Sequence, residues 1–164
     1  MHYRNSSGIA NVGSVRSMMM SNLFLQECKY SEMDAQKYKI LLVEDERLLR
    51  FIINAFFKKL GVELDEAKNG LEAVEKFKEN DYDLILMDIQ MPIMDGFEAV
   101  ELIRRIEKER SGKPRTKIVA VTTNHDKEKC LESGMDSYYQ KPIMMEEIIQ
   151  IVNELDSYEM ARNS

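Results

Sequence analysis

The chain has 164 residues, which is the length of one domain of ordinary size. A hydrophobic fraction of 44% suffices for a single core, while 32% charged residues and a formal net charge of −6 indicate a soluble acidic protein. This charge argues against a nucleic-acid partner, because a DNA-binding surface needs clustered Lys and Arg. The apolar runs are far shorter than the roughly 20 residues that span a bilayer, so we expect no membrane segment.

Cysteine usage suggests the compartment. Cys28 and Cys130 lie far apart in the sequence and form no CxxC pair. So few cysteines favour a reducing compartment, and we expect the cytoplasm, with the nucleus as an alternative. We interpret Cys130 as a small apolar residue on a helix face.

The N-terminal residues 1–37 differ in composition from the rest. They have no clear apolar period, and no acidic residue precedes Glu27, while Arg4 and Arg16 are present. We interpret this segment as a disordered tail or the product of a wrongly chosen start codon, with an organelle transit peptide as the alternative. The predicted organisation is a folded domain at 38–157 followed by a C-terminal tail at 158–164.

From residue 38 onward, short apolar runs alternate with segments of helical period. The runs are short and mostly rich in branched residues, which is typical of buried strands, and they lie at 39–43, 62–67, 83–87, 117–121 and 137–140. The second run is more polar, so we place it nearer a sheet edge. Helical spacing of apolar residues follows each run, at 48–60, 71–77, 97–106, 126–133 and 148–155. Five strand–helix units predict an α/β fold with a parallel sheet and helices on both faces.

Four of the five predicted strands end in polar or charged residues. In open parallel sheets, ligands bind outside the carboxyl ends of the strands, so these residues should share one edge. In strand order they are Glu44-Asp45-Glu46, Asp88, Thr122-Thr123 and Lys141-Pro142.

The carboxylates at this edge predict a metal site. Asp45, Asp88 and Glu44 would repel one another unless a cation is bound. Ligands that are all oxygen suit Mg²⁺, which usually shares its coordination shell with phosphate oxygens. For Glu46 we prefer a solvated position at the start of a loop.

The chemistry that this edge favours is phosphoryl transfer. The carboxylate of Asp88 can attack phosphorus and form an aspartyl phosphate. Such a transfer needs positioning and charge neutralisation more than acid–base catalysis. Mg²⁺, the ammonium of Lys141 and the hydroxyl of Thr122 would supply that neutralisation. The peptide before Pro142 could be cis.

The residues 39–155 resemble the receiver domain of response regulators. The segments that carry this resemblance are Leu42-Val43-Glu44-Asp45-Glu46, Asn69-Gly70-Leu71-Glu72-Ala73, residues 83–92, Met94-Asp95-Gly96, Gly134-Met135-Asp136 and Lys141-Pro142. Residues 87–96, MDIQMPIMDG, look like those of hybrid histidine kinases and eukaryotic phosphorelay receivers. The resemblance implies a flavodoxin-like fold with strand order 2-1-3-4-5.

The resemblance also implies a metal site and an acceptor. By position, Asp88 is the phosphoacceptor and Lys141 pairs with the phosphoryl group. Mg²⁺ (or Mn²⁺) is bound by Asp45, Asp88 and the backbone carbonyl of Gln90, while Glu44 helps through water.

A conformational switch is implied as well. Thr122 is the switch hydroxyl and Tyr138 the switch aromatic, while Pro92 and Gly96 shape the loop after the acceptor. Phosphorylation would shift an equilibrium between two states of the face formed by the fourth helix and fifth strand.

The implied partner is a histidine kinase or a histidine phosphotransfer protein, and a transient dimer is a further expectation. The protein would not be an enzyme beyond its own phosphoryl transfer and slow autodephosphorylation. The sequence does not identify the donor, nor whether the chain acts alone or within a hybrid kinase.

Three departures from the family pattern bear on this prediction. Thr123 replaces the usual Ala, Gly or Ser, and its bulk could crowd access to Asp88. The segment from Thr122 to Gly134 is about one helical turn shorter than usual. Met144 replaces a common capping Ser or Thr, at a cost on the order of 1 kcal/mol.

One alternative function is compatible with the sequence, and the sequence argues against two others. A degenerate receiver that acts only as an interaction module is compatible with Thr123 and the short fourth helix. A hydrolase of the haloacid-dehalogenase type needs an acid two residues after its nucleophile, where this chain has Gln90. FMN binding is disfavoured because the loop after the first strand is acidic.

Overall fold

The computed structural model describes residues 38–110, 112–123 and 127–162, with side chains placed up to residue 155. These residues belong to one compact unit, Ala35–Ser164. The sequence-based interpretations of residues 1–37, Cys28 among them, and of residue 126 as a helix start lie outside the described residues.

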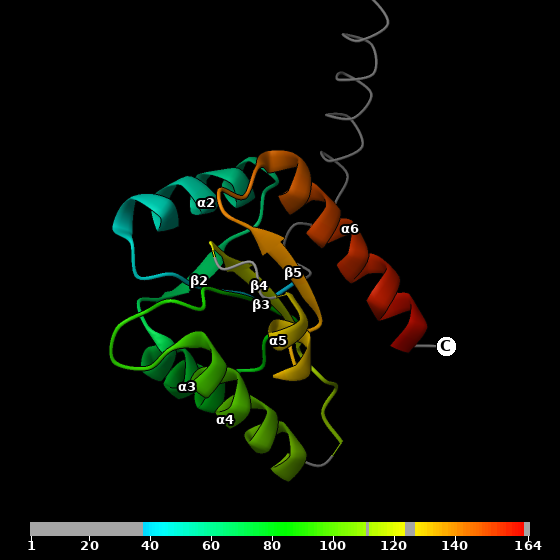
Figure 1. The fold of residues 1–164 in the computed structure, drawn as a ribbon. Coiled ribbons are helices and arrows are strands. Elements are labelled where there is room, and N and C mark those ends of the chain that lie inside the picture. Colours follow the sequence, from blue (N-terminus) through cyan, green and yellow to red (C-terminus); the bar gives the residue numbers. More distant parts are fainter. Residues whose placement is uncertain (1–37, 111, 124–126, 163–164) are drawn as a thin grey trace, which may run out of the picture. The chain divides into compact units, whose positions relative to one another are not determined.

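One parallel five-stranded sheet organises the fold, in the order β2-β1-β3-β4-β5 (Figure 1). This order and the parallel pairing confirm the α/β fold predicted from the sequence. The strands are β1 (Ile40–Val43), β2 (Leu64–Ala67), β3 (Leu84–Met87), β4 (Lys117–Thr122) and β5 (Ser137–Gln140).

Burial follows the position of each strand in the sheet. All residues of β1, β3 and β4 are buried, because helices cover both faces of these central strands. The edge strands β2 and β5 are mostly half-buried. The apolar runs of the central strands therefore fix their position along the sheet, and with it the position of the residue that follows each strand.

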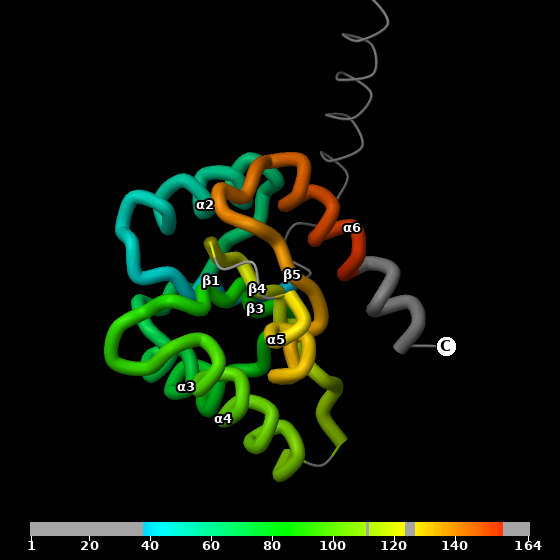
Figure 2. The backbone as a smooth tube through the Cα atoms, in the orientation of Figure 1, coloured from blue at the N-terminus to red at the C-terminus, as the bar shows by residue number. Residues whose placement is uncertain are grey.

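Helices cover the two faces in two groups. Figures 1 and 2 show α2 and α6 on one face of the sheet and α3, α4 and α5 on the other. Among the described residues, no helix combines the length and the apolar character needed to cross a membrane. The helices are α2 (Arg47–Lys59), α3 (Gly70–Glu79), α4 (Gly96–Glu109), α5 (Lys127–Glu132) and α6 (Met145–Arg162).

The junction between α2 and β2 differs from the prediction. Val62 was expected to begin the second strand, but its amide donates to the carbonyl of Phe57 at 3.0 Å, and the amide of Gly61 donates to that of Lys58 at 3.0 Å. Gly61 has a φ of 74°. This is the Schellman pattern that ends a helix, so Val62 completes the cap of α2 and β2 starts at Leu64.

The C-terminal helix is also longer than expected. The sequence suggested a tail from residue 158, but α6 continues to Arg162. Met144, just before α6, has no hydroxyl to cap the helix; instead its own amide donates to the carboxylate of Glu147 at 2.8 Å. This bond is half of a capping box.

The loop after β3 is held against the sheet by close backbone contacts. A β-carbon added to Gly96 would lie 2.2 Å from the carbonyl oxygen of Asp88, so only glycine fits there. The amide of Gly96 donates to the carbonyl of Ile89 at 2.9 Å. Asp95 and Glu98 then form a complete capping box that starts α4. The path of the chain after Asp88 is therefore tightly fixed.

Candidate functional site

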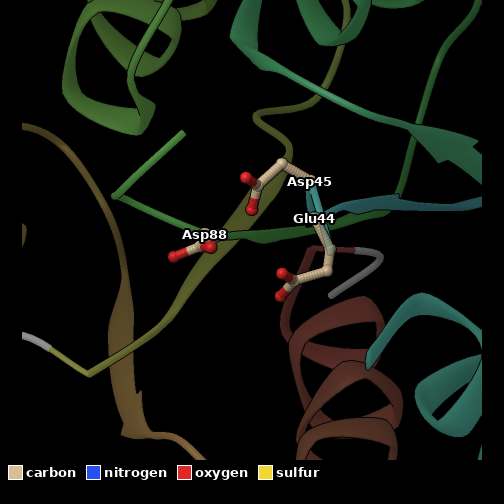
Figure 3. Close-up of side chains that lie close together, drawn as sticks. All are labelled: Glu44, Asp45 and Asp88. Atoms are coloured by element: carbon tan, nitrogen blue, oxygen red, sulfur yellow. The ribbon is translucent and has the colours of Figure 1, made fainter. Parts of the chain in front are cut away.

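Three carboxylates gather where β1 and β3 end (Figure 3). Val43 pairs with Met87 in the parallel sheet, so the next residues, Glu44 and Asp88, leave neighbouring strands side by side. The amide of Asp88 still donates to the carbonyl of Val43 at 2.9 Å. Glu44, Asp45 and Asp88 each offer an oxygen, and these oxygens lie within 4.8 Å of one another.

Two of the three acids are buried. Glu44 is 1% exposed and Asp88 is 4% exposed, whereas Asp45 is exposed. Buried carboxylates are costly unless they are paired or bind a cation. The arrangement therefore calls for positive charge at this edge of the sheet.

Lys141 provides part of that charge. It follows β5, and its amide continues the ladder by donating to the carbonyl of Thr122 at 3.0 Å. Its Nζ lies 2.6 Å from Asp88 Oδ2 and 2.6 Å from Glu44 Oε2. Lys141 thus pairs with two acids from two different strands, and the peptide that joins it to Pro142 is cis.

Burial and pairing shift the pKa values of this group. Burial raises the pKa of Glu44 above its ordinary value and outweighs the opposing effect of Lys141. Burial acts to lower the pKa of Lys141, but hydrogen bonds and charge from Asp88 and Glu44 outweigh it, so that pKa is raised. Lys141 is therefore a cation at neutral pH.

The donor atoms fit a small divalent cation. Lys141 brings one positive charge to three carboxylates, which leaves negative charge for a metal to neutralise. Mg²⁺ binds oxygen at about 2.1 Å in octahedral geometry, which places opposite ligands roughly 4.2 Å apart. The spacing of these carboxylate oxygens is of that size, and Mn²⁺ accepts a similar set of oxygen ligands.

The loop after Asp88 holds the second carboxylate oxygen. The amide of Gln90 donates to Asp88 Oδ1 at 3.2 Å, while Asp88 Oδ2 accepts from Lys141. Both oxygens of Asp88 are therefore oriented by the protein. The assignment of the Gln90 carbonyl as a metal ligand remains a prediction.

Thr122 and Thr123 lie on β4 and just after it. Thr122 is the last residue of the strand and is fully buried. Thr123 is exposed, and its hydroxyl donates to Gln90 Oε1 at 2.9 Å. The sequence suggested that Thr123 crowds Asp88 by bulk. The structure adds a different feature, which is a hydrogen-bonded bridge between the loops after β3 and β4.

Tyr138 lies on β5, opposite Ala120 of β4. It is half-buried and packs against the apolar core that includes Cys130 of α5. The helix α5 spans Lys127–Glu132 in the part of the chain that the structure describes. The role of Tyr138 as a switch residue stays a prediction.

Arg50 contacts the site, and the sequence analysis did not predict this. Its Nη1 donates to the carbonyls of Glu44 and Asp45, at 2.8 Å each. It shares the buried stripe of α2 with Ile53 and Phe57. An arginine in phase with apolar residues on a helix is the signal that could have revealed it.

The fold and this edge together define a class of protein. A parallel sheet in this order, with an acidic cluster and a lysine at its carboxyl edge, is the architecture of flavodoxin-like receiver domains. The family model of the response regulator receiver domain matches residues 40–153, and the chain belongs to that family.

The similar curated proteins are histidine kinases, and several of them are hybrid kinases. Hybrid signal transduction histidine kinase B of Dictyostelium discoideum is 48% identical over 121 residues, which are 68% of this chain and 6% of that protein. Kinase G of the same organism is 40% identical over 134 residues, or 79% of this chain and 4% of that protein. The chain thus spans a small fraction of the length of these relatives.

Two solved structures are informative. The receiver domain of Ssk1 from Saccharomyces cerevisiae, crystallised with the histidine phosphotransfer protein Ypd1, is 35% identical with a TM-score of 0.68, and covers 73% of this chain and 88% of that one. The receiver of the sensor histidine kinase PA1611 from Pseudomonas aeruginosa, with magnesium in its active-site cleft, is 34% identical with a TM-score of 0.64, and covers 72% of this chain and 96% of that one.

Proposed function

We propose that this domain accepts a phosphoryl group from a phosphohistidine donor onto Asp88. The observation that carries the proposal is the environment of this carboxylate. It is buried at the end of β3, hydrogen bonded by Lys141 at 2.6 Å, and grouped with Glu44 and Asp45. Membership of the receiver family supports the same conclusion.

The transfer balances without a further reactant. A carboxylate oxygen of Asp88 forms a bond to phosphorus as the bond between phosphorus and the donor's imidazole nitrogen breaks. The electron pair of that bond stays on the nitrogen, which leaves a neutral histidine once protons equilibrate. Lys141 and the hydroxyl of Thr122 stabilise the negative charge on the phosphoryl oxygens.

Mg²⁺ is the proposed cofactor, with Mn²⁺ as a substitute. Asp45 and Asp88 would hold it directly with the Gln90 carbonyl, and Glu44 would assist through water. When bound, the ion neutralises charge on the transferring phosphoryl group. The magnesium ion in the related PA1611 receiver supports this assignment.

The proposed partner is a histidine phosphotransfer protein or a histidine kinase. Large apolar side chains are exposed near the site: Leu48 and Phe51 on α2, Ile93 in the loop after β3, and Met144 after Lys141. Each follows a site residue by a few positions along the chain. We infer that they form the docking surface for a domain that carries phosphohistidine, and the Ssk1–Ypd1 complex of a relative supports this choice.

The further parts of the proposal concern output. Phosphorylation would change the face formed by α5 and β5 through Thr122 and Tyr138. The domain would catalyse its own phosphoryl transfer and slow hydrolysis and would act as a signalling protein in the cytoplasm or nucleus.

Replacement of the acceptor tests the proposal. We expect the Asp88→Asn variant to fold and to take up no phosphoryl group from acetyl phosphate or from labelled phosphotransfer proteins, because an amide is a poor nucleophile. The matched control is Asp81→Asn, an exposed aspartate that precedes β3 at the other end of the strand. Phos-tag electrophoresis and intact mass report the labelling, and circular dichroism reports the fold.

Retained labelling of Asp88→Asn would sink the assignment of the acceptor. If the wild-type protein takes up no phosphoryl group from any donor but still binds phosphotransfer proteins, it is a degenerate receiver that acts as an interaction module.

A further inference from the structure

Arg50 is a buried cation directly behind the acidic loop. It lies in the first turns of α2 and is 8% exposed. One of its terminal nitrogens, Nη1, donates to the backbone carbonyls of both Glu44 and Asp45 at 2.8 Å. These are the two consecutive acids of the proposed metal site.

The contacts with carbonyls, rather than with carboxylates, decide what Arg50 can do. A backbone carbonyl that is fixed in direction fixes the plane of its own peptide group, so contacts to the carbonyls of Glu44 and Asp45 fix the two peptide planes that flank Asp45. The direction of the side chain then follows from the backbone. Arg50 holds two successive carbonyls, so it sets the orientation of the segment from which the carboxylates of Glu44 and Asp45 project.

The guanidinium is itself held from the other side. Its Nε lies 3.3 Å from Glu66 Oε2, on the edge strand β2. The other oxygen of Glu66 accepts from the side-chain amide of Asn54 at 2.6 Å. A planar guanidinium with donors in a fixed fork can serve Glu66 and both carbonyls at once, whereas a lysine ammonium is a point charge on a flexible stem.

We propose that Arg50 is a positioning residue of the metal site, oriented by Glu66, and that it presents the carboxylates of Glu44 and Asp45 to a divalent cation. The proposal rests on the proposed Mg²⁺ site and extends it to residues that touch neither metal nor phosphoryl group. Outer residues of this kind typically change metal affinity by 10- to 100-fold.

Calorimetric titration of Mg²⁺ into the unphosphorylated protein tests this role without any phosphoryl transfer. We expect Arg50→Lys to keep the charge but to lose about tenfold in Mg²⁺ affinity, because it cannot hold two carbonyls and Glu66 together. Glu66→Gln should lose roughly two- to threefold, since a neutral partner orients the guanidinium less firmly.

Two controls separate positioning from general stability. Ile53→Val shortens a buried side chain on the same stripe of α2 and should lower the melting temperature with no change in Mg²⁺ affinity. Asn54→Ala removes a contact to Glu66 that does not reach the acidic loop, and should also keep the affinity. Amide chemical shifts of residues 44–46 in metal-free protein report the orientation of the loop directly.

The outcomes separate the two proposals. Wild-type Mg²⁺ affinity in both Arg50→Lys and Glu66→Gln would overturn the role of Arg50 while leaving the metal site intact. A wild-type protein that binds no Mg²⁺ at millimolar concentration would overturn the metal site itself. If Arg50→Lys does not fold, Glu66→Gln decides, because Glu66 lies partly exposed on an edge strand.

Discussion

The bridge between Thr123 and Gln90 joins the loops after β4 and β3, close to Asp88. The backbone amide of Gln90 donates to Asp88 Oδ1, and its side-chain oxygen Oε1 accepts a hydrogen bond from the hydroxyl of Thr123. The two loops follow β3 and β4 at the carboxyl edge of the sheet, and the bridge is connected to Asp88 through Gln90. The bridge therefore offers a physical reason for an effect of Thr123 on the reaction that does not depend on bulk alone.

We expect Thr123→Ala to be phosphorylated faster by acetyl phosphate and to lose its phosphoryl group faster than wild type. One net hydrogen bond contributes about 0.5–1.5 kcal/mol, which corresponds to roughly two- to tenfold in rate. Mg²⁺ affinity should not change. Thr123→Ser, which keeps the hydroxyl, should resemble wild type; if both variants label and decay at wild-type rates, Thr123 has no influence on access.

The candidate site could largely be located from the sequence, for a physical reason. Each central strand is a fully buried run, so the residues at its end must lie at the carboxyl edge, and this placed Glu44 and Asp88 just after their strands and Thr122 as the last residue of β4. Arg50 could not be placed in this way. Its phase with Ile53 and Phe57 could indicate that it is buried, but not where it donates, because its partners are backbone carbonyls, which every residue has.

At the scale of elements, the ion pair between Lys117 and Glu154 joins β4 to α6. Lys117 is buried, and its Nζ lies 2.7 Å from Glu154 Oε2, while Gln150 donates to the other oxygen at 3.1 Å. Burial acts to raise the pKa of Glu154, but the hydrogen bond and charge of Lys117 outweigh it and lower the pKa.

The folded-state pKa of Glu154 lies below the unfolded value of about 4.5, so its ionised carboxylate adds to the free energy of unfolding above that pH. This stability is lost as the pH falls through the folded-state pKa. We expect Glu154→Gln to lower the free energy of unfolding by about 1 kcal/mol at pH 7, a value kept small because the glutamate is partly exposed. The two proteins should converge once the pH lies below the folded-state pKa of Glu154.

Urea unfolding of wild type and Glu154→Gln at pH 7 and at pH 3 measures the difference in their free energies of unfolding. The matched control is Glu101→Gln, an exposed glutamate in the middle of α4, which should change stability little at either pH. A deficit in Glu154→Gln that is equally large at pH 3 would mean that packing, rather than charge, causes it.

At the level of elements, order and type were predictable and some boundaries were not. The apolar period of α2 was visible, yet it included Leu48 and Ile52, which the structure leaves exposed, while the polar Arg50 is buried. The start of β2 was misplaced because Val62 is buried as strongly as a strand residue, although its backbone belongs to a helix cap. Burial alone does not distinguish these two backbone conformations.

At the scale of the whole molecule, binding of a cation should raise the free energy of unfolding. A ligand that binds only the folded state adds RT ln(1 + [L]/Kd), which is about 1.4 kcal/mol at ten times Kd. We expect Mg²⁺ to raise the melting temperature of the unphosphorylated protein by roughly 5 °C under that condition. The physical reason is relief of repulsion among Glu44, Asp45 and Asp88.

Differential scanning calorimetry at constant ionic strength measures the shift, with NaCl replacing MgCl₂ in the control. The variant Asp45→Asn removes the exposed acid of the cluster and should lose most of the shift while it keeps the fold. A melting temperature that does not change with Mg²⁺ in the wild-type protein contradicts the predicted metal site.

The pairing of Lys141 with acids from β1 and β3 has a consequence for biosynthesis. The ribosome makes Glu44 and Asp88 well before Lys141, and β5 joins the sheet only through β4. Until residue 141 has left the exit tunnel, a nascent chain can pair β1 with β3 but must bury two acids without their counter-charge. Translation therefore completes this cluster only after Lys141 has emerged, and a chain truncated before Lys141 would carry the carboxylates of Glu44 and Asp88 without their ammonium partner.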